Sequence, residues 1–134
     1  MNDVTGMEFD WLGVDREGFI ALFSSAGFGP VPKAALDEEQ FLTNITGRVS
    51  KLPFLGACRS IGSHGVCTDW VSAAQRGLFA YDWVQGSGTY YRLVAIPSVP
   101  IRSDAVADPE IARVAMQVVF DLDFREADSI NVTI

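Results

Sequence analysis

The chain has 134 residues, of which 49% are aliphatic, aromatic or cysteine and 20% are charged, with a net charge of −7 and a pI near 4.5. This length suits one domain with one hydrophobic core, and the composition excludes a disordered chain. The negative charge disfavours binding to nucleic acid or to anionic lipid and favours a basic partner.

The sequence contains no apolar run near the length of about eighteen residues that a membrane span requires. Residues 1–11 have neither the basic nor the apolar region of a secretion signal, so we expect a cytoplasmic protein. Only Cys58 and Cys67 are present, which excludes a disulfide framework and predicts two free thiols. A chain of this size buries enough surface to fold without a metal or another cofactor, and none is expected.

The first elements predicted are the strands of a β-hairpin. Phe9–Leu12 and Phe19–Phe23 are rich in β-forming residues, and a polar connection containing glycine joins them. Ser24–Pro32 follows with two glycines and two prolines, which exclude a central strand and a helix interior. We expect an ordered loop there.

A helix of about three turns is predicted next, from an N-cap at Asp37 to a stop at Pro53. Its apolar residues fall at helical spacing: Phe41, Leu42, Ile45, Val49 and Leu52. The following segment, Leu55–Val66, holds three glycines and no steady period, which predicts a loop.

A shorter helix is predicted over Trp70–Arg76. Thr68 or Asp69 can cap its start, and Gly77 is a natural left-handed terminator with the cation of Arg76 in the favourable last turn.

A second hairpin is expected from Leu78–Trp83 and Tyr90–Ile96, with the turn at Gln85–Gly88. Because neighbouring residues of a strand point to opposite faces, one of Tyr90 and Tyr91 is expected to be exposed. Asp82 lies within the first of these strands, where an acid on the solvent-facing side of a half-buried sheet is ordinary.

The last third of the chain predicts a helix followed by strands. Asp108–Glu110 combines a cap, a proline and an acid, which is a strong helix start. The helix is expected to give way near Gln117 to a strand whose apolar residues, Val118, Phe120, Leu122 and Phe124, alternate with polar ones. Asp121 and Asp123 would share the solvent-facing side of that strand, and Ile130, Val132 and Ile134 predict a last short one.

The predicted fold class is therefore α+β, with antiparallel hairpins forming a sheet packed against two to three helices in a single domain over residues 1–134.

One group of residues has chemical potential: Cys58, His64 and Cys67, within a glycine-rich segment. Structural zinc requires four ligands, and no fourth is evident, so no metal site is expected. A Cys–His nucleophile pair is the alternative, and it leaves open a small cysteine- or metal-dependent hydrolase. The sequence shows no group that would orient the His64 imidazole, so no catalytic set is predicted.

Two segments carry a resemblance to a known family. Phe9–Asp15 with Gly18 and then Phe23–Pro32 form the first, and Arg76–Trp83 forms the second. Together they resemble a family of small bacterial immunity proteins found beside secreted polymorphic or type VI toxins. The resemblance implies a protein that binds and blocks its sister toxin in the cytoplasm, and it supplies no catalytic residues. Pro53–Thr68 matches no pattern of the family, and partner specificity is expected there.

The composition and the resemblance lead to one hypothesis: a stoichiometric inhibitor that occludes the active site of a basic toxin domain with an acidic, aromatic surface. The activity of that toxin and a homo-oligomeric state of this chain are left open. The candidate partner-binding residues are Tyr90, Tyr91, Asp82, Asp121, Asp123 and His64.

Overall fold

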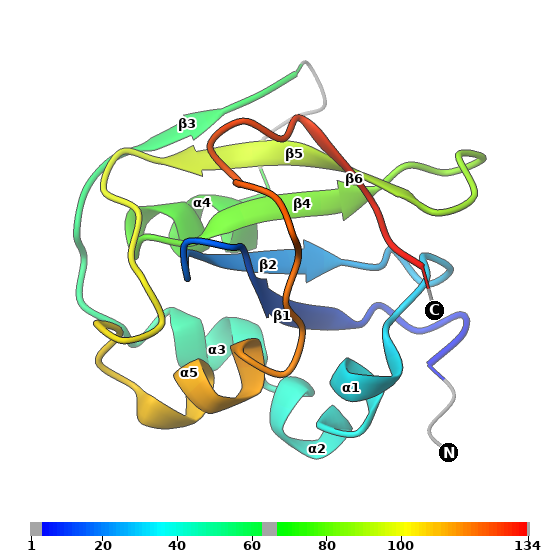
Figure 1. Cartoon of the computed structure of the whole chain (residues 1–134), viewed down its shortest axis with the longest axis horizontal. Coiled ribbons are helices and arrows are strands. Elements are labelled where there is room, and N and C mark those ends of the chain that lie inside the picture. Colours follow the sequence, from blue (N-terminus) through cyan, green and yellow to red (C-terminus); the bar gives the residue numbers. More distant parts are fainter. Residues whose placement is uncertain (1–3, 63–66, 134) are drawn as a thin grey trace.

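The computed structural model describes residues 4–62 and 67–133, which form a six-stranded sheet and five helices and confirm the α+β class (Figure 1). The strands are β1 (Asp10–Val14), β2 (Ile20–Ser24), β3 (Cys58–Ser60), β4 (Phe79–Trp83), β5 (Tyr90–Pro97) and β6 (Ser129–Asn131). The helices are α1 (Lys33–Leu36), α2 (Glu39–Leu42), α3 (Ile45–Val49), α4 (Thr68–Gln75) and α5 (Pro109–Ala115).

Both predicted hairpins are present, as the antiparallel pairs β1–β2 and β4–β5. They are joined through β2 and β4, which run parallel, so that the strand order is β1, β2, β4, β5, β3, with β6 also beside β5. The parallel pair follows from the long connection between β2 and β4, which includes α1 to α4 and returns the chain to the same end of the sheet. The sheet is therefore mixed rather than wholly antiparallel.

The loop predicted over residues 55–66 contains a strand, β3, which pairs with the second half of β5. Ile61 donates its backbone N–H to the Val94 carbonyl, and Ser98 donates to the carbonyl of Ala57. The prediction was wrong because β3 has only three residues, of which two are exposed, so its sequence has no alternation of apolar and polar residues.

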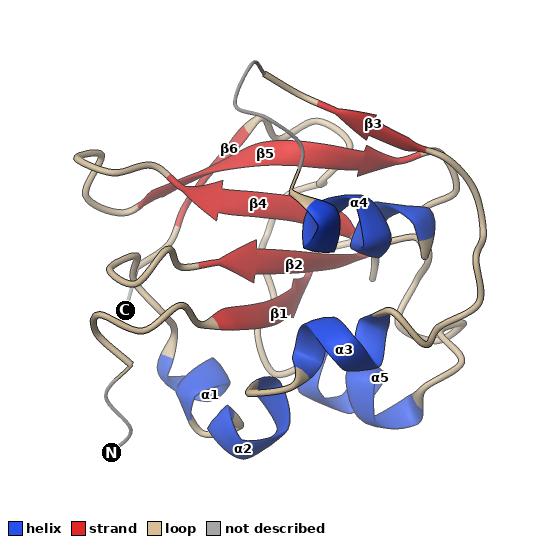
Figure 2. Ribbon diagram, turned by 180° about the vertical axis from the view of Figure 1, so that it is seen from behind, coloured by secondary structure: helices blue, strands red, loops and turns tan. Residues whose placement is uncertain are grey.

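The single helix predicted from Asp37 to Pro53 is also wrong: α1, α2 and α3 are separate short helices. Asp37 ends α1, where its carboxyl accepts from the Lys33 ammonium, and it does not cap a following helix. Asn44 has a φ of −113°, outside the helical range, and separates α2 from α3. Each break turns the chain, so that these helices bury apolar residues beside β1 (Figure 2).

Helix α5 begins as predicted, because the Asp108 carboxyl accepts hydrogen bonds from the backbone N–H groups of Glu110 and Ile111. The strand predicted over 118–124 is wrong. Val119 forms only an isolated bridge with Val14, and the rest of the segment makes bends and turns across one face of the sheet.

The alternation of apolar and polar residues in 118–124 serves burial rather than strand pairing. Val118 and Phe124 are buried while Val119 and Asp121 are exposed. The final strand, β6, is shorter than predicted, with buried Ile130, and Val132 buried beyond its end, while Ile134 lies outside the described residues.

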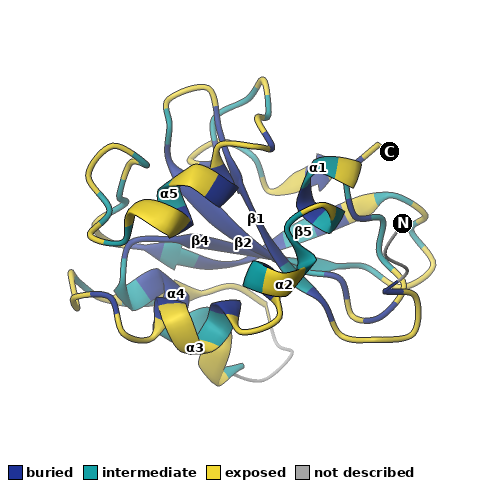
Figure 3. Cartoon of the chain, turned by 90° about the horizontal axis from the view of Figure 1, so that it is seen from below, coloured by how far each residue is buried: buried dark blue, intermediate teal, exposed yellow. Residues whose placement is uncertain are grey.

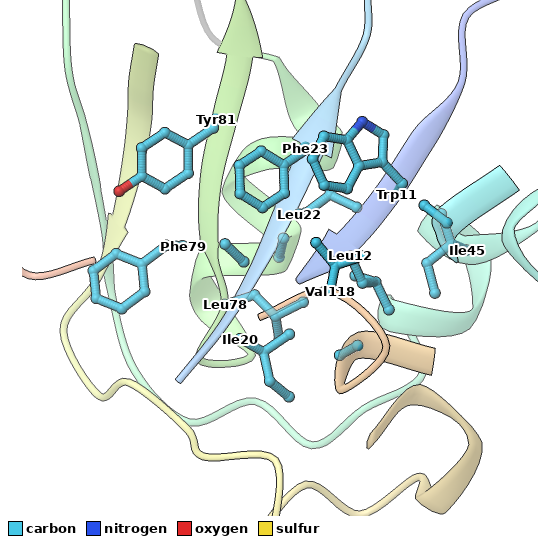
Figure 4. Packing of buried hydrophobic residues seen from close by; sticks show 14 of the residues in the cluster. Trp11, Leu12, Ile20, Leu22, Phe23, Ile45, Leu78, Phe79, Tyr81 and Val118 are labelled. Carbon is cyan, nitrogen blue, oxygen red and sulfur yellow. The ribbon is translucent and has the colours of Figure 1, made fainter. Parts of the chain in front are cut away.

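One face of the sheet carries a row of aromatic rings. Trp11, Phe23 and Tyr81 occupy paired positions on β1, β2 and β4, and their rings stack with centroid distances of 4.2 Å and 5.2 Å (Figure 4). Phe124, from the 118–127 segment, packs over this row and is fully buried. Large aromatic surfaces buried in this way contribute much of the core energy.

The opposite face is covered by α4 (Figure 2). Ala73 and Ala74 of α4 are buried, and Ala74 packs with Ala80 and Ala95, so small side chains allow the helix to approach the strands closely. The predicted terminator Gly77 has a φ of +96°, a conformation that glycine adopts without strain.

Buried residues concentrate in the strands, while the outer sides of α3 and α5 are exposed (Figure 3). Among the described residues, none of the helices has the length and apolar character needed to cross a membrane.

Candidate functional site

A row of polar residues crosses the sheet where β2 and β4 end. Asp10 pairs with Ser24, Ser24 with Asp82, and Asp82 with Arg92, so the four side chains lie on one face across four strands. This is the face that α4 covers, and Trp70 in the first turn of α4 donates its indole N–H to the Ser24 hydroxyl at 3.0 Å. The helix therefore begins beside the polar row.

A cavity of about 100 Å³ lies between the start of α4 and this row. We call it the acidic hollow, and its lining residues are Glu8, Asp10, Ser24, Ala26, Cys67, Asp69, Trp70 and Asp82. Glu8, Asp10 and Asp69 form no ion pair with any described residue. Four carboxyl groups in so small a space make this end of the molecule strongly negative.

The environment of Asp10 raises its pKa to about 6. Burial is the main cause because it penalises the charged form, and the nearby carboxyls of Asp69, Glu8 and Asp82 add to the increase. A hydrogen bond with the Ser24 hydroxyl lowers the pKa, but by less than burial raises it. Asp10 is therefore ionised at neutral pH and becomes neutral in mildly acidic solution.

A second, larger cavity of about 410 Å³ adjoins the first and shares Ala26 and Asp82 with it. We call it the aromatic hollow, and its lining residues are Ala26, Phe28, Asp82, Trp83, Val84, Gln85 and Arg92. Phe28 is 66% exposed, which is unusual for a phenylalanine and places a large apolar ring beside the acidic hollow.

Of the two adjacent tyrosines, Tyr90 is the exposed one, at 47%, and Tyr91 is fully buried. Tyr90 lies two residues before Arg92 and so faces the same side as the polar row. The Tyr91 hydroxyl donates to the Pro30 carbonyl and accepts from the Trp11 indole N–H. The prediction that one tyrosine is exposed is confirmed, and Tyr91 as a surface contact is wrong.

Asp121 and Asp123 do not share the face of a strand as predicted, because no strand forms there. Asp121 has a side chain 99% exposed and lies 3.4 Å from the Arg16 guanidinium. The Asp123 carboxyl accepts hydrogen bonds from the guanidinium and from the backbone N–H of Arg125, and this pairing lowers its pKa to about 2. Asp123 is thus already neutralised by its own neighbour.

The cysteines lie in different surroundings. Cys67 precedes α4 and lines the acidic hollow, whereas Cys58 is on β3 and packs against Ala74 and its neighbours. His64 lies outside the described residues. Within 4–62 and 67–133, no group of three or more histidine, cysteine, aspartate or glutamate side chains is arranged to hold a metal ion.

Sequence reasoning found Asp82, which lines both hollows, and Tyr90, which lies outside them on the same face. It missed Glu8, Asp10, Asp69 and Phe28, which also line the hollows. A sequence signal existed for one of them: Phe28 lies in a loop of small residues, where a large ring has few places to be buried. The acids carried no such signal, since their proximity depends on the parallel pairing of β2 and β4.

Comparison with models of known protein families, with curated proteins and with solved structures finds no match to this chain.

Proposed function

We propose that this chain is an immunity protein that binds a basic toxin domain and covers its active site. The observation that carries the proposal is the gathering of the Glu8, Asp10 and Asp69 carboxyls, which form no ion pair with a described residue, beside exposed aromatic rings at one end of the sheet. The resemblance of the Phe9–Asp15, Phe23–Pro32 and Arg76–Trp83 segments to immunity proteins supports the same function.

The acidic hollow supplies the charge for this interaction. A basic toxin domain would be drawn to the negative end of the molecule, which increases the rate of encounter more than it increases the strength of the final complex. An arginine or lysine of the toxin would find the carboxyls of Glu8, Asp10 and Asp69, which no described cation of this chain neutralises.

Two exposed aromatic side chains supply the anchors: Phe28 lines the aromatic hollow, and Tyr90 lies outside it on the same face of the sheet as the polar row. Phe28 and Tyr90 are exposed side chains of the kind that dominate binding energy when a partner buries them. Because neither is held in the core, both can be buried on binding without loss of packing in the free protein. They should therefore control the rate of dissociation.

The candidate contacts are revised accordingly. Asp82 and Tyr90 are retained, and Glu8, Asp10, Asp69 and Phe28 are added. Tyr91 is excluded because it is buried, and Asp123 is a poor candidate because Arg125 already pairs with it. A role for His64 or for other residues of Pro53–Thr68 in specificity stays a prediction.

Co-expression with a toxin encoded beside this gene is the decisive experiment. We expect the toxin to kill cells alone, to be harmless with this protein, and to co-purify with it. Equal killing with and without this protein, together with no co-purification, would refute the proposal. The hydrolase that would use Cys58, His64 and Cys67 stays the alternative prediction in that case.

Binding kinetics of the purified pair then test the surface. The double variant Glu8→Lys, Asp69→Lys should slow association at least about tenfold with a smaller effect on dissociation. Phe28→Ala should shorten the lifetime of the complex, with Val119→Ala as the matched control because Val119 is also 66% exposed but lies outside both hollows. Equal effects of Phe28→Ala and Val119→Ala would exclude this surface.

A further inference from the structure

The turn that follows β2 has a strained backbone. Among the described residues, Ala26 is the only one other than glycine with a positive φ, at +53°. Gly27 follows with a φ of +92°, and the Phe28 backbone N–H donates to the Ser25 carbonyl at 3.2 Å. Two positive φ values with this hydrogen bond are those of a type I′ turn, whose first central position favours asparagine or glycine because a larger side chain is strained there. Alanine at this position therefore costs free energy that glycine would not.

Hydrogen bonds nevertheless hold the turn firmly. The buried Ser25 hydroxyl accepts from the backbone N–H groups of Phe9 at 3.1 Å and Gly27 at 3.3 Å. The Gly29 N–H donates to the Ser25 carbonyl at 2.8 Å, and the Gly6 N–H donates to the Gly27 carbonyl at 2.6 Å. The conformation of the turn is therefore fixed in the free protein.

The end of the turn rests on the core. A Cβ at Gly29 would lie 2.7 Å from both the Trp83 ring and the Tyr91 hydroxyl oxygen, so the backbone lies directly against these side chains. The same hydroxyl donates to the Pro30 carbonyl at 2.9 Å. The turn therefore cannot move inward to bury more of its own surface.

This rigid turn exposes a large ring. Phe28 is 66% exposed, although Gly27 before it is buried and Gly29 after it is half-buried. Neither the strained backbone of Ala26 nor the exposed ring of Phe28 stabilises the free protein, and the two lie in one turn. Strained backbone that the surrounding structure holds in place clusters at functional sites. A side chain presented in this way loses little conformational freedom when a partner buries it.

We propose that residues 25–29 are a preformed docking turn and that Phe28 enters an apolar pocket of the partner bordered by lysine or arginine. This inference rests on the proposed function and names the surface of the partner. The pocket is apolar because an aromatic anchor contributes most when it is fully desolvated. Its border is basic because Ala26 also lines the acidic hollow, where Glu8 and Asp69 form no ion pair with a described residue.

Hydrogen exchange of the free protein tests whether the turn is preformed. We expect the amides of Gly27 and Gly29 to exchange at least about a hundredfold more slowly than in an unstructured peptide. Ser25→Ala removes the hydroxyl acceptor and keeps the carbonyl, so it should speed exchange more at Gly27 than at Gly29. Exchange of both wild-type amides at peptide rates would overturn the inference, whether or not the toxin binds.

Melting temperatures test the strain at Ala26. Ala26→Gly should raise the melting temperature by about 2–4 °C, whereas Ala26→Val, with a β-branched side chain at the same φ, should lower it. Gly18→Ala is the matched control, because it places an alanine at a φ of +85° in the turn between β1 and β2, at the opposite end of these strands, and should also lower it. A lower melting temperature for Ala26→Gly would overturn the assignment of strain.

Binding kinetics with the toxin then test whether Ala26 is a positioning residue that acts through Phe28. Ala26→Val should shorten the lifetime of the complex several-fold, because it displaces the ring. In the Phe28→Ala background the same substitution should cause no further loss. Gly18→Ala should leave the lifetime unchanged. Additive effects of Ala26→Val and Phe28→Ala would overturn the positioning role.

Photo-crosslinking identifies the pocket on the toxin. With p-benzoylphenylalanine in place of Phe28, we expect links to apolar toxin residues that have lysine or arginine beside them. The same group in place of Val119, which is also 66% exposed, should give no link. Equal linking from both positions, or links only to acidic residues, would overturn the inference while a toxin neutralised in co-expression leaves the proposed function in place. A toxin that kills cells regardless of this protein would refute both.

Discussion

The carboxyl group of Asp15 is expected to be a main determinant of stability. It is 2% exposed and accepts three backbone hydrogen bonds: from Glu17 at 3.0 Å, from Phe19 at 2.9 Å and from Phe124 at 2.9 Å. The first two bonds form the turn between β1 and β2. The third ties the 118–127 segment, which covers the aromatic face, to that turn.

The Asp15→Ala variant should lose about 3–5 kcal/mol of unfolding free energy. Two of the three donors, in Phe19 and Phe124, are buried, and a buried donor left without a partner costs about 1–3 kcal/mol. The N–H of Glu17 can be hydrated and should add little. Because the total stability of such a domain is about 5–15 kcal/mol, this loss is a large fraction of it.

Urea denaturation followed by tryptophan fluorescence measures the effect. With a slope of about 2 kcal/mol per molar urea, the midpoint should fall by about 2 M. Asp15→Asn keeps one acceptor oxygen but loses the bond to Phe124. Its urea midpoint should therefore lie between those of the wild-type protein and Asp15→Ala. The exposed Asp104→Ala is the control and should change stability by less than about 0.5 kcal/mol. An Asp15→Ala midpoint equal to that of the control would refute the reasoning.

Three further predictions concern the core, the acidic hollow and metal content. Phe79→Ala should lower the unfolding free energy by about 3–5 kcal/mol because the ring is fully buried. Trp83→Ala should lower it by less because Trp83 is only half-buried. Equal melting temperatures for the two variants would contradict this. Burial raises the pKa of Asp10 from 3.8 to about 6, so its ionisation opposes folding increasingly as the pH rises above 3.8 and fully above about pH 6. Asp10→Asn should therefore raise the melting temperature at pH 8 and keep only a minor part of this gain near pH 4.5. A gain independent of pH would show that the charge is irrelevant. Elemental analysis of the purified protein should find far less than one zinc per chain, because the Cys58–Cys67 segment lacks a fourth ligand; stoichiometric zinc would overturn that reading.

Local signals predicted those elements whose ends are set by one or two residues. The cap at Asp108 placed the start of α5, and Gly77 placed the end of α4, because a side-chain hydrogen bond and a left-handed residue act within a single turn. The two hairpins were found because their strands are bounded by glycine-containing connections.

The elements that were missed depend on distant partners. β3 is a strand only because β5 offers it a free edge, and its three residues contain no pattern of their own. The segment 118–124 alternates as a strand does, yet Phe124 hydrogen-bonds to Asp15 rather than to a neighbouring strand. In both cases tertiary contacts decided where the backbone hydrogen bonds went.

The candidate site was beyond prediction for the same reason. Asp10, Ser24 and Asp82 are distant in sequence and become neighbours only through the register of β1, β2 and β4. Alternation predicted that one of Tyr90 and Tyr91 is exposed, but only the packing of Trp11 against the Tyr91 ring determines which.

The same three strands therefore carry two independent sets of residues. Trp11, Phe23 and Tyr81 form the stacked core on one face, and each is the sequence neighbour of a member of the polar row on the other face. Because neighbouring strand residues point in opposite directions, a change in the row leaves the stack intact. The proposed inhibitor would have to match one particular partner, and this arrangement would allow the proposed binding surface to change while the aromatic core continues to hold the sheet together.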